Sequence, residues 1–356
     1  MNARTPRRRY LLYAYHDYSF PILGPIREAI AARGGEVAWF VHGKARPEHY
    51  LDDTDNLLET VDAVIDYDPF AVITPNNTVP HFFPGIKAQI FHGFNARKRS
   101  KGGVDSHFAI RGFFDLYCTQ GPSTTRVFQD LSDRHEHFAV IETGWPKMDN
   151  LAKQLDEQPS QPKPKDRPTI ILTSTFSRKL TCAIHLLPVI KQLVAKNDMD
   201  WLVQFHPKMS PDIASAYRAI QADNYQFIET TNVMPYLAQA DVMVSDTSSI
   251  LQEFLQLTRP VVTLRNRTPG PWLIDIQEPE ELQGAIERAL ARPPELIKEI
   301  EAYNALLHPY SDAQSSERVL NAIETFAAAE NKPRRRKPFN AIRKFKIRKE
   351  LDYWRL

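Results

Sequence analysis

Two histidines follow predicted strands, at positions where an acid–base catalyst could act. His92 follows the apolar run 88–91 and precedes Gly93. His206 directly follows the run 201–205. A histidine with a pKa near 6.5 can take a proton from a hydroxyl at neutral pH. In open α/β sheets, ligands bind at the carboxyl ends of the strands. Either histidine alone could be structural, but one in each half of the chain predicts a catalytic pair, His92 and His206.

A cluster of polar side chains follows a third predicted strand, 241–245, and precedes a predicted helix, 248–256. Hydroxyls at such a place can cap the helix. The same hydroxyls, together with unpaired backbone N–H groups, can also bind a phosphate. A carboxylate one turn into the helix could hold ribose hydroxyls. The sequence predicts a nucleotide-phosphate site made of Asp246, Thr247, Ser248, Ser249 and Glu253.

A basic segment follows His92, and it contains Arg97 and Lys98. It would attract an anionic substrate, although a solvated turn is an equal alternative. The chain contains no H-E-x-x-H motif and no closely spaced cysteine pair, so we expect no metal and no cofactor. Basic side chains and helix ends would then neutralise a bound pyrophosphate.

Alternating strands and helices must position these groups. The segment 156–168 holds four prolines and separates two halves of similar length. Such alternation predicts parallel sheets built from βαβ units. We therefore expect an α/β protein with two Rossmann-like domains facing a central cleft, plus a basic helical tail. The predicted boundaries are 1–153 for the N-terminal domain, 154–168 for the linker, 169–330 for the C-terminal domain and 331–356 for the tail.

The predicted strands are 10–15, 36–41, 88–91, 115–119 and 137–142 in the first half, and 169–173, 201–205, 226–229, 241–245 and 260–264 in the second. Short apolar runs also occur at 63–66 and 70–74. The main predicted helices are 21–33, 183–196, 248–256 and 278–291. Neither G-x-G-x-x-G after the first strand nor a P-loop motif is present, which argues against nicotinamide, flavin and P-loop kinase chemistry.

Several short motifs, in order, resemble the CDP-glycerol glycerophosphotransferase family of teichoic-acid primases and polymerases. They are Phe91-His92-Gly93, Gly144-Trp145-Pro146-Lys147-Met148-Asp149, Thr175-Phe176-Ser177-Arg178, His206-Pro207, Ser245-Asp246-Thr247-Ser248-Ser249 and the closing stretch 310–318. Phe91, Lys147 and Thr247 replace the tryptophan, arginine and tyrosine of the family pattern.

The resemblance implies a GT-B transferase that moves a glycerol-phosphate group from a CDP-activated donor to a hydroxyl of a lipid-linked or polymer acceptor in envelope synthesis. His92 would be the general base, and His206 would assist at the phosphate. Thr175 and Arg178 would join the polar cluster at the donor, and Lys147 would join Arg97 and Lys98 on the acceptor side. The length of 356 residues favours a single addition over repeated transfer.

Two alternatives remain open. Glu253, the run 260–265 and the stretch 309–312 resemble UDP-N-acetylglucosamine 2-epimerases. Those enzymes carry glycines where Ser248 and Ser249 stand, and a Gly-Thr-Arg-Pro-Glu signature that is missing after Tyr15. A non-catalytic membrane-associated adaptor is the alternative from another class.

Charge is distributed unevenly along the chain. Residues 332–356 carry 11 Lys and Arg against two acidic residues, a balance of +9 within a total of +2. Phe339, Ile342, Phe345 and Trp354 alternate with these charges. This pattern predicts a peripheral anchor on an anionic membrane surface, at the inner face of the cell membrane. A disordered solubilising tail and a nucleic-acid arm are the alternatives, the latter with the least support.

The remaining composition is that of a globular protein without disulfides. Hydrophobic residues make up 42% and charged residues 25% of the chain. Cys118 and Cys182 lie in apolar runs and are expected to be buried and unpaired. No apolar run is long enough to cross a bilayer, and a cytoplasmic location is expected.

Overall fold

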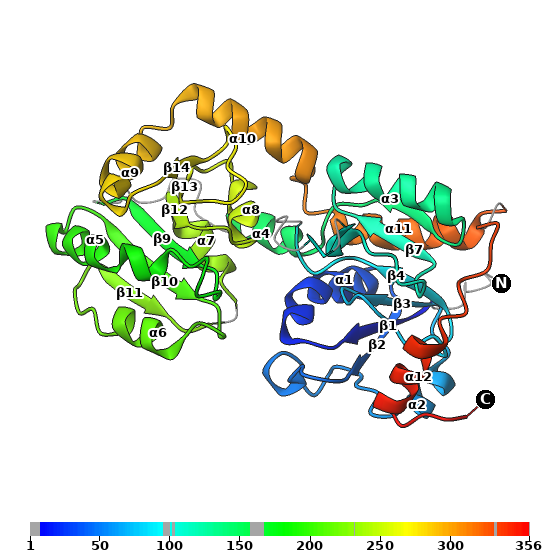
Figure 1. The fold of residues 1–356 in the computed structure, drawn as a ribbon. Helices are drawn as coiled ribbons and strands as arrows, with labels where there is room; N and C mark the ends of the chain where they lie inside the picture. Colours follow the sequence, from blue (N-terminus) through cyan, green and yellow to red (C-terminus); the bar gives the residue numbers. More distant parts are fainter. Residues whose placement is uncertain are drawn as a thin grey trace. The chain divides into compact units, whose positions relative to one another are not determined.

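The computed structural model describes residues 8–94, 100–101, 104–156, 167–230, 232–330 and 333–355. The chain divides into two compact units (Figure 1). The first comprises residues 1–92, 106–150 and 307–356, and the second comprises 93–105 and 151–306. Each unit holds one six-stranded parallel sheet, as the alternating pattern predicts. Arg97 and Lys98 lie outside the described residues.

The sheet of the first unit has the strand order β2-β1-β3-β4-β7-β8. Its strands are nearly continuous apolar runs because helices cover both faces of a parallel sheet. Helices α1 and α11 pack against each other, and α3 packs against β7 and β8. The bounds are β1 Arg9–Ala14, α1 Phe20–Ala32, β2 Glu36–Val41, α2 Val61–Tyr67, β3 Ala71–Thr74, β4 Ile86–Gln89, β7 Leu116–Thr119, α3 Pro122–His135, β8 Ala139–Glu142, α4 Lys147–Asp156, α11 Ser315–Ala328 and α12 Ala341–Glu350, with short 3-10 turns η1 Asp17–Ser19, η2 Pro47–His49 and η3 Ser106–Phe108.

The sheet of the second unit has the order β11-β10-β9-β12-β13-β14. Counted within this unit, the order is 3-2-1-4-5-6, the arrangement of doubly wound nucleotide-binding folds. The direction of winding reverses between β9 and β12, which pair directly. The bounds are β5 Ser100–Lys101, β6 Val104–Asp105, β9 Thr169–Ser174, α5 Ala183–Lys196, β10 Asp200–Phe205, α6 Pro211–Arg218, β11 Tyr225–Ile228, α7 Met234–Gln239, β12 Val242–Ser245, α8 Ile250–Leu255, β13 Val261–Leu264, β14 Ile274–Ile276, η4 Pro279–Glu281, α9 Leu282–Leu290 and α10 Pro294–Leu307.

The last part of the chain differs from the predicted boundaries. Residues 307–330 were expected in the second domain, but the structure groups them with the first unit. Asp149 holds them there, because its carboxylate accepts hydrogen bonds from the Ser315 and Ser316 amides at 2.9 and 2.7 Å. It also accepts one from the Ser316 hydroxyl at 2.7 Å. The motif containing Asp149 and the motif at 310–318 therefore meet at the start of α11.

The basic tail also packs on the first unit. Ile347, Leu351 and Tyr353 lie against its aromatic core. Lys337 forms an ion pair with Asp115 at 2.6 Å, and it donates to the Phe113 carbonyl at 2.9 Å. The disordered alternative for the tail is therefore wrong for residues 333–355. No helix in the described part of the chain is long and apolar enough to cross a membrane.

Candidate functional site

The loops that follow β9, β10, β12 and β13 form the candidate nucleotide site of the second unit. They lie at the carboxyl ends of neighbouring strands and on both sides of the point where the winding reverses. Ligands of doubly wound sheets bind at this place. The predicted residues Thr175, Arg178, His206 and 246–249 all belong to these loops.

Asp246 connects two of the loops. It is 1% exposed, and its carboxylate accepts hydrogen bonds from the Thr175 and Cys182 amides, each at 3.0 Å, and from the Ser174 hydroxyl. The buried carboxylate thus holds the loop after β9 against the end of β12. Its role in this structure is to position the loop, and its negative charge would disfavour direct contact with a phosphate.

Ser248 and Ser249 are placed differently. Both are partly exposed, and neither hydroxyl has a hydrogen-bond partner within the described ranges. Ser249 occupies the N-cap position of α8, yet its side chain does not cap the helix. Capping therefore does not explain this serine pair, which leaves both hydroxyls available to a ligand. The helix is shorter than predicted, at six residues.

Thr247 links the polar cluster to the loop after β13. Its hydroxyl accepts a hydrogen bond from the Arg267 amide at 3.0 Å, and the Asn266 side chain donates to the Asp246 carbonyl at 3.0 Å. The Arg267 side chain is exposed and has no acidic partner among the residues described. The sequence reasoning missed Arg267, although the strand-end rule applied to 260–264 would have found it. An arginine here can neutralise a bound phosphate.

Glu253 is the buried carboxylate that the spacing predicted one turn after Ser249. It is 7% exposed on α8. Its neighbour Gln252 donates to the Tyr303 hydroxyl at 2.8 Å, and the Tyr303 ring stacks on Trp272 with centroids 4.2 Å apart. This aromatic pair, also missed from sequence, borders the same loop as Arg267.

His206 is exposed after β10, as expected. Its Nδ1 accepts a hydrogen bond from the Lys208 amide at 3.0 Å. In the neutral ring the proton is then on Nε2. The Phe176 ring lies 4.7 Å from the imidazole, centroid to centroid. Phe176 directly follows Thr175, whose amide donates to Asp246. The buried carboxylate therefore helps to place the ring that packs on His206.

Arg178 is committed to another contact. Its guanidinium forms an ion pair with Asp212 at 3.2 Å and donates to the Ser210 hydroxyl at 3.2 Å. These contacts join the loop after β9 to the start of α6. A donor phosphate would have to compete with Asp212 for this arginine.

In the first unit, the backbone around His92 is strained. Phe91 is buried and has φ +59°, a left-handed conformation that a bulky residue rarely adopts. The Trp145 indole donates to the Phe91 carbonyl at 3.2 Å and helps to hold this turn. His92 is therefore presented to solvent at the sheet edge. Such strain often accompanies function.

Lys147 lies close to the same turn. Its Nζ lies 5.4 Å from the centre of the Trp145 ring, and this indole binds the Phe91 carbonyl. The structure therefore brings Lys147 and the His92 turn to one region of the first unit.

Neither cysteine is suited to nucleophilic chemistry. Both are fully buried and unpaired, as predicted. Burial raises the pKa of the Cys118 thiol, and burial together with Asp246 raises the pKa of Cys182 well above its ordinary value. Neither forms a thiolate near neutral pH.

One family model, described as UDP-N-acetylglucosamine 2-epimerase, matches residues 120–324. The match covers more than half of the chain. The chain belongs to this family. The motifs had favoured the glycerophosphotransferases and kept the epimerases as the alternative, so the family match agrees with the alternative.

Curated relatives of the epimerase family match a shorter segment. A probable UDP-N-acetylglucosamine 2-epimerase of Ralstonia nicotianae is 23% identical over 137 residues, which is 37% of this chain and 36% of the relative. A second, from Ralstonia solanacearum, is 22% identical over the same length. The alignment thus spans about a third of the length of these curated relatives.

Solved structures of both kinds share the fold. The wall teichoic acid polymerase TagF has 14% identity and TM-score 0.65, with 90% of this chain and 89% of that chain covered. A putative epimerase from Listeria monocytogenes has 14% identity and TM-score 0.65, with 92% and 98% covered. MnaA of S. aureus with UDP has 15% identity and TM-score 0.63, with 92% and 99% covered. The two six-stranded sheets and these neighbours establish the two-domain GT-B fold.

Proposed function

We propose that the chain is a transferase that binds a nucleoside-diphosphate-activated donor in its second unit and moves a polyol-phosphate group, such as glycerol phosphate, to an acceptor hydroxyl. The observation that carries the proposal is the uncommitted hydroxyl pair of Ser248 and Ser249 at the strand edge. Backbone and hydroxyl donors beside an arginine are the groups that bind a pyrophosphate. Thr247, Arg267 and Glu253 would complete this donor site.

The proposed reaction breaks one phosphoanhydride bond. The acceptor oxygen forms a bond to the β-phosphorus of a CDP-activated donor, and the bond from that phosphorus to the bridging oxygen breaks. CMP leaves with the bridging oxygen. His92 takes the acceptor proton, and the Nε2–H of His206 donates a hydrogen bond to the transferring phosphate. Lys147, and Arg97 and Lys98 outside the described residues, would attract the anionic acceptor.

A direct product assay tests this proposal. The protein is incubated, with EDTA present, with CDP-glycerol or UDP-N-acetylglucosamine, and nucleotide products are separated by chromatography. CMP release that requires an added acceptor and is lost in His92→Ala supports the transferase. His185→Ala, which changes an exposed histidine on α5, is the matched control and should stay active. CMP release that persists in His92→Ala would refute the role of this base.

The second candidate is a UDP-N-acetylglucosamine 2-epimerase, and the family match favours it. In the same assay it would convert the uridine substrate to its 2-epimer and leave CDP-glycerol intact. That outcome would replace the transferase proposal.

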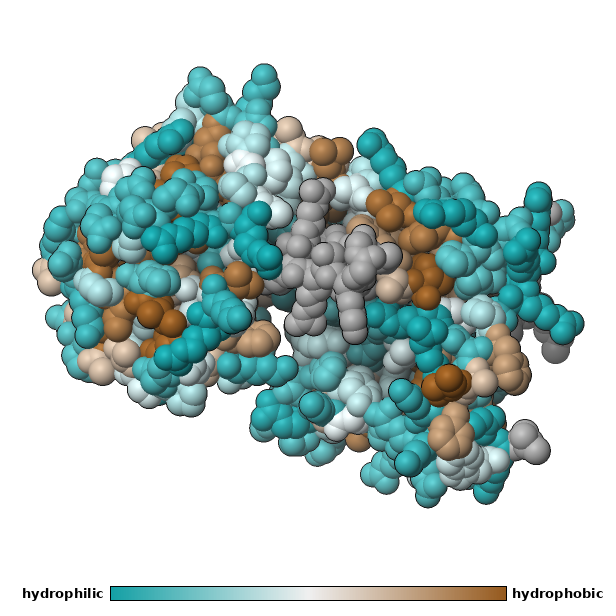
Figure 2. All heavy atoms as spheres, viewed as in Figure 1, coloured by the Kyte–Doolittle hydropathy of each residue, from teal (hydrophilic) through white to brown (hydrophobic). Residues whose placement is uncertain are grey.

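For the tail we propose a peripheral contact with an anionic membrane surface. Ile347 of α12 and Leu351 just after it pack against the core of the first unit, while Ile342 and Phe345 are 75% and 56% exposed. Figure 2 shows brown and tan atoms among teal ones in the region where Figure 1 draws this helix. The exposed basic residues near it include Arg334, Arg336, Lys346 and Lys349.

Each basic residue near such a surface contributes about 1 kcal/mol of binding. Vesicle flotation tests the contact. The full chain should float with anionic vesicles and stay behind with neutral ones, and Phe345→Ser should weaken flotation. Equal recovery with both vesicle types would refute it.

A further inference from the structure

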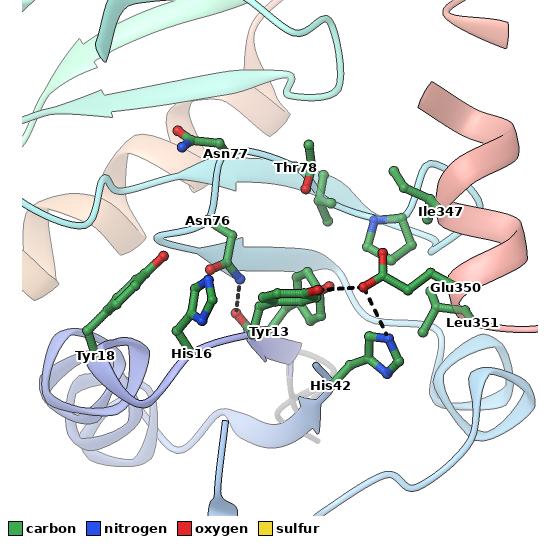
Figure 3. Close-up of a pocket in the computed structure, with 13 residues that line it drawn as sticks. Tyr13, His16, Tyr18, His42, Asn76, Asn77, Thr78, Ile347, Glu350 and Leu351 are labelled. Atoms are coloured by element: carbon green, nitrogen blue, oxygen red, sulfur yellow. Dashed lines mark hydrogen bonds and ion pairs between the residues drawn. The ribbon is translucent and has the colours of Figure 1, made fainter. Parts of the chain in front are cut away.

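A cavity lies in the first unit, at the carboxyl ends of β1, β2 and β3 (Figure 3). Its volume is about 300 Å³. The strand order places it where the winding of this sheet reverses, between β1 and β3. Doubly wound sheets bind ligands at that position. The volume is at the lower end of the ~300–1,000 Å³ range of small-molecule sites, enough for one ring-sized group.

The tail helix forms one wall of this cavity. Ile347 and Glu350 of α12 line it, together with Leu351, which follows the helix. The Tyr15 hydroxyl donates to the Glu350 carboxylate at 2.6 Å, and His42 Nε2 lies 3.7 Å from the same oxygen. Figure 3 shows the contact between His42 and Glu350. All the residues that line the cavity, from the strand side and from the tail, lie outside the 120–324 family match.

The chemistry of the wall points to an uncharged ligand. Among the described residues that line the cavity, none is Lys or Arg, so the wall offers no fixed positive charge to a phosphate. Three tyrosines and two histidines supply ring faces and polar edges. They are Tyr13, Tyr15, Tyr18, His16 and His42.

A buried acceptor in the wall has no partner. Asn76 is 5% exposed, and its Nδ2 donates to the Tyr13 carbonyl at 3.4 Å. Its Oδ1 is buried and accepts no hydrogen bond from any residue within the described ranges. A buried polar atom left in this way costs free energy unless water or a ligand donates to it. Asn76 lines the cavity, so a small rotation of its side chain would let a ligand hydroxyl supply that donor.

Hydroxyl donors and apolar C–H faces together describe a sugar ring. Tyrosine rings pack against its C–H faces, while Asn76, Asn77 and Glu350 accept or donate hydrogen bonds around its edge. Tyr18 also lies beside His92, with ring centroids 5.4 Å apart. The cavity and the candidate base therefore share a side chain.

We infer that this tail-walled cavity binds an uncharged sugar unit of the acceptor. Its role as acceptor subsite rests on the proposed transfer, whereas sugar binding itself does not. The site takes a neutral pyranose through Tyr15, Tyr18 and Asn76, and the tail helix completes it through Glu350.

Ligand-observed NMR titration of the full-length protein tests this inference. The probes are methyl glycosides of glucose, galactose and N-acetylglucosamine, with glucuronic acid and inorganic phosphate as anionic comparisons. Tyr18→Ala removes a ring that is 39% exposed, so the fold should tolerate it. Asn77→Ala is a second, smaller change in the wall. Tyr236→Ala, on α7 of the second unit, is the matched control.

At least one neutral glycoside should bind, and Tyr18→Ala should weaken its affinity at least tenfold, with a smaller loss in Asn77→Ala. Tyr236→Ala should bind as the unchanged protein does. Three results would overturn the inference: no neutral glycoside bound at tens of millimolar, affinity unaffected by both wall variants, or preference for glucuronic acid or phosphate.

Nucleotide binding measured in the same samples separates the two proposals. Sugar binding that fails while nucleotides bind leaves the proposed function in place and removes the acceptor subsite. Nucleotide binding that fails while sugar binds removes the proposed transfer and keeps the sugar site.

Discussion

Two buried carboxylates offer a matched test of how the nucleotide site is held. Asp149 and Asp246 are 2% and 1% exposed. Each accepts hydrogen bonds from two backbone amides and one hydroxyl, Asp149 at the start of α11 and Asp246 at the loop after β9. Asparagine keeps the size of either side chain but replaces one oxygen by an amino group. The new amino group would face a backbone N–H that the carboxylate now accepts from. Two donors would then meet, and one of them would be left buried without an acceptor.

The magnitude follows from these contacts. One unpaired buried N–H costs about 1–3 kcal/mol, and two hydrogen bonds that lose their charged partner weaken by about 1 kcal/mol each. Asp149→Asn and Asp246→Asn should each lower the free energy of unfolding by about 3–5 kcal/mol. For a unit of this size the melting temperature would fall by roughly 6–20 °C.

Nucleotide binding then distinguishes the two variants. Isothermal titration at 15 °C, where both variants should remain folded, would show weaker binding only for Asp246→Asn, since only that carboxylate fixes the loop beside Ser248 and His206. Asp223→Asn, which changes an exposed carboxylate before β11, should change neither property strongly. If Asp246→Asn binds nucleotide as tightly as Asp149→Asn does, the positioning role of Asp246 is refuted.

Three further predictions concern the tail, pH and the strained turn. Gly112 has φ +72°, and a Cβ there would lie 2.3 Å from Pro338 Cγ. Gly112→Ala should therefore release the tail and speed its proteolysis. An unchanged rate of tail proteolysis would contradict this contact. Burial lowers the pKa of His308 from 6.5 to about 4, so the stability that its neutral ring contributes is complete above pH 6.5 and is lost as the pH falls toward 4. The loss should reach about 2 kcal/mol at pH 5. His308→Gln should flatten urea-unfolding stability between pH 7 and 5, and an equally steep decline would exclude His308 as the cause. Trp145→Phe removes the hydrogen bond to the Phe91 carbonyl and should lower turnover more than nucleotide affinity; a fall in affinity alone would contradict its role at the His92 turn.

The periodic parts of the sequence predicted the fold well. Continuous apolar runs identified most of the strands because both faces of a parallel sheet are buried. The run 63–66 lies in helix α2. Thr60 caps the start of this helix, because its hydroxyl accepts a hydrogen bond from the Ala63 amide. Asp68, with φ +45°, caps its end. A short apolar run alone cannot tell a strand from a buried helix turn. Local pattern also could not place 307–330, because the Asp149 contact that holds it spans over 160 residues.

The candidate site could be proposed in part for similar reasons. Strand ends pointed to His92, His206 and the polar cluster, because the edge of the sheet lies where each apolar run stops. The burial of Asp246 and the ion pair of Arg178 with Asp212 depend on tertiary packing, so composition could not reveal that they position loops. The tail-walled cavity depends on contacts between residues more than 300 positions apart, such as Tyr15 and Glu350.

The most direct test of the central claim is a thermal-shift panel of CDP-glycerol, CDP-ribitol, CMP, UDP-N-acetylglucosamine and UDP with EDTA present. A ligand at about 100 times its Kd adds about 2.7 kcal/mol to the stability of the protein that binds it. The account predicts stabilisation by the cytidine nucleotides that is lost when Ser248→Ala and Ser249→Ala are combined. Stabilisation by the uridine nucleotides alone would contradict the transferase and support the epimerase, and no response to any of them would contradict the nucleotide site itself.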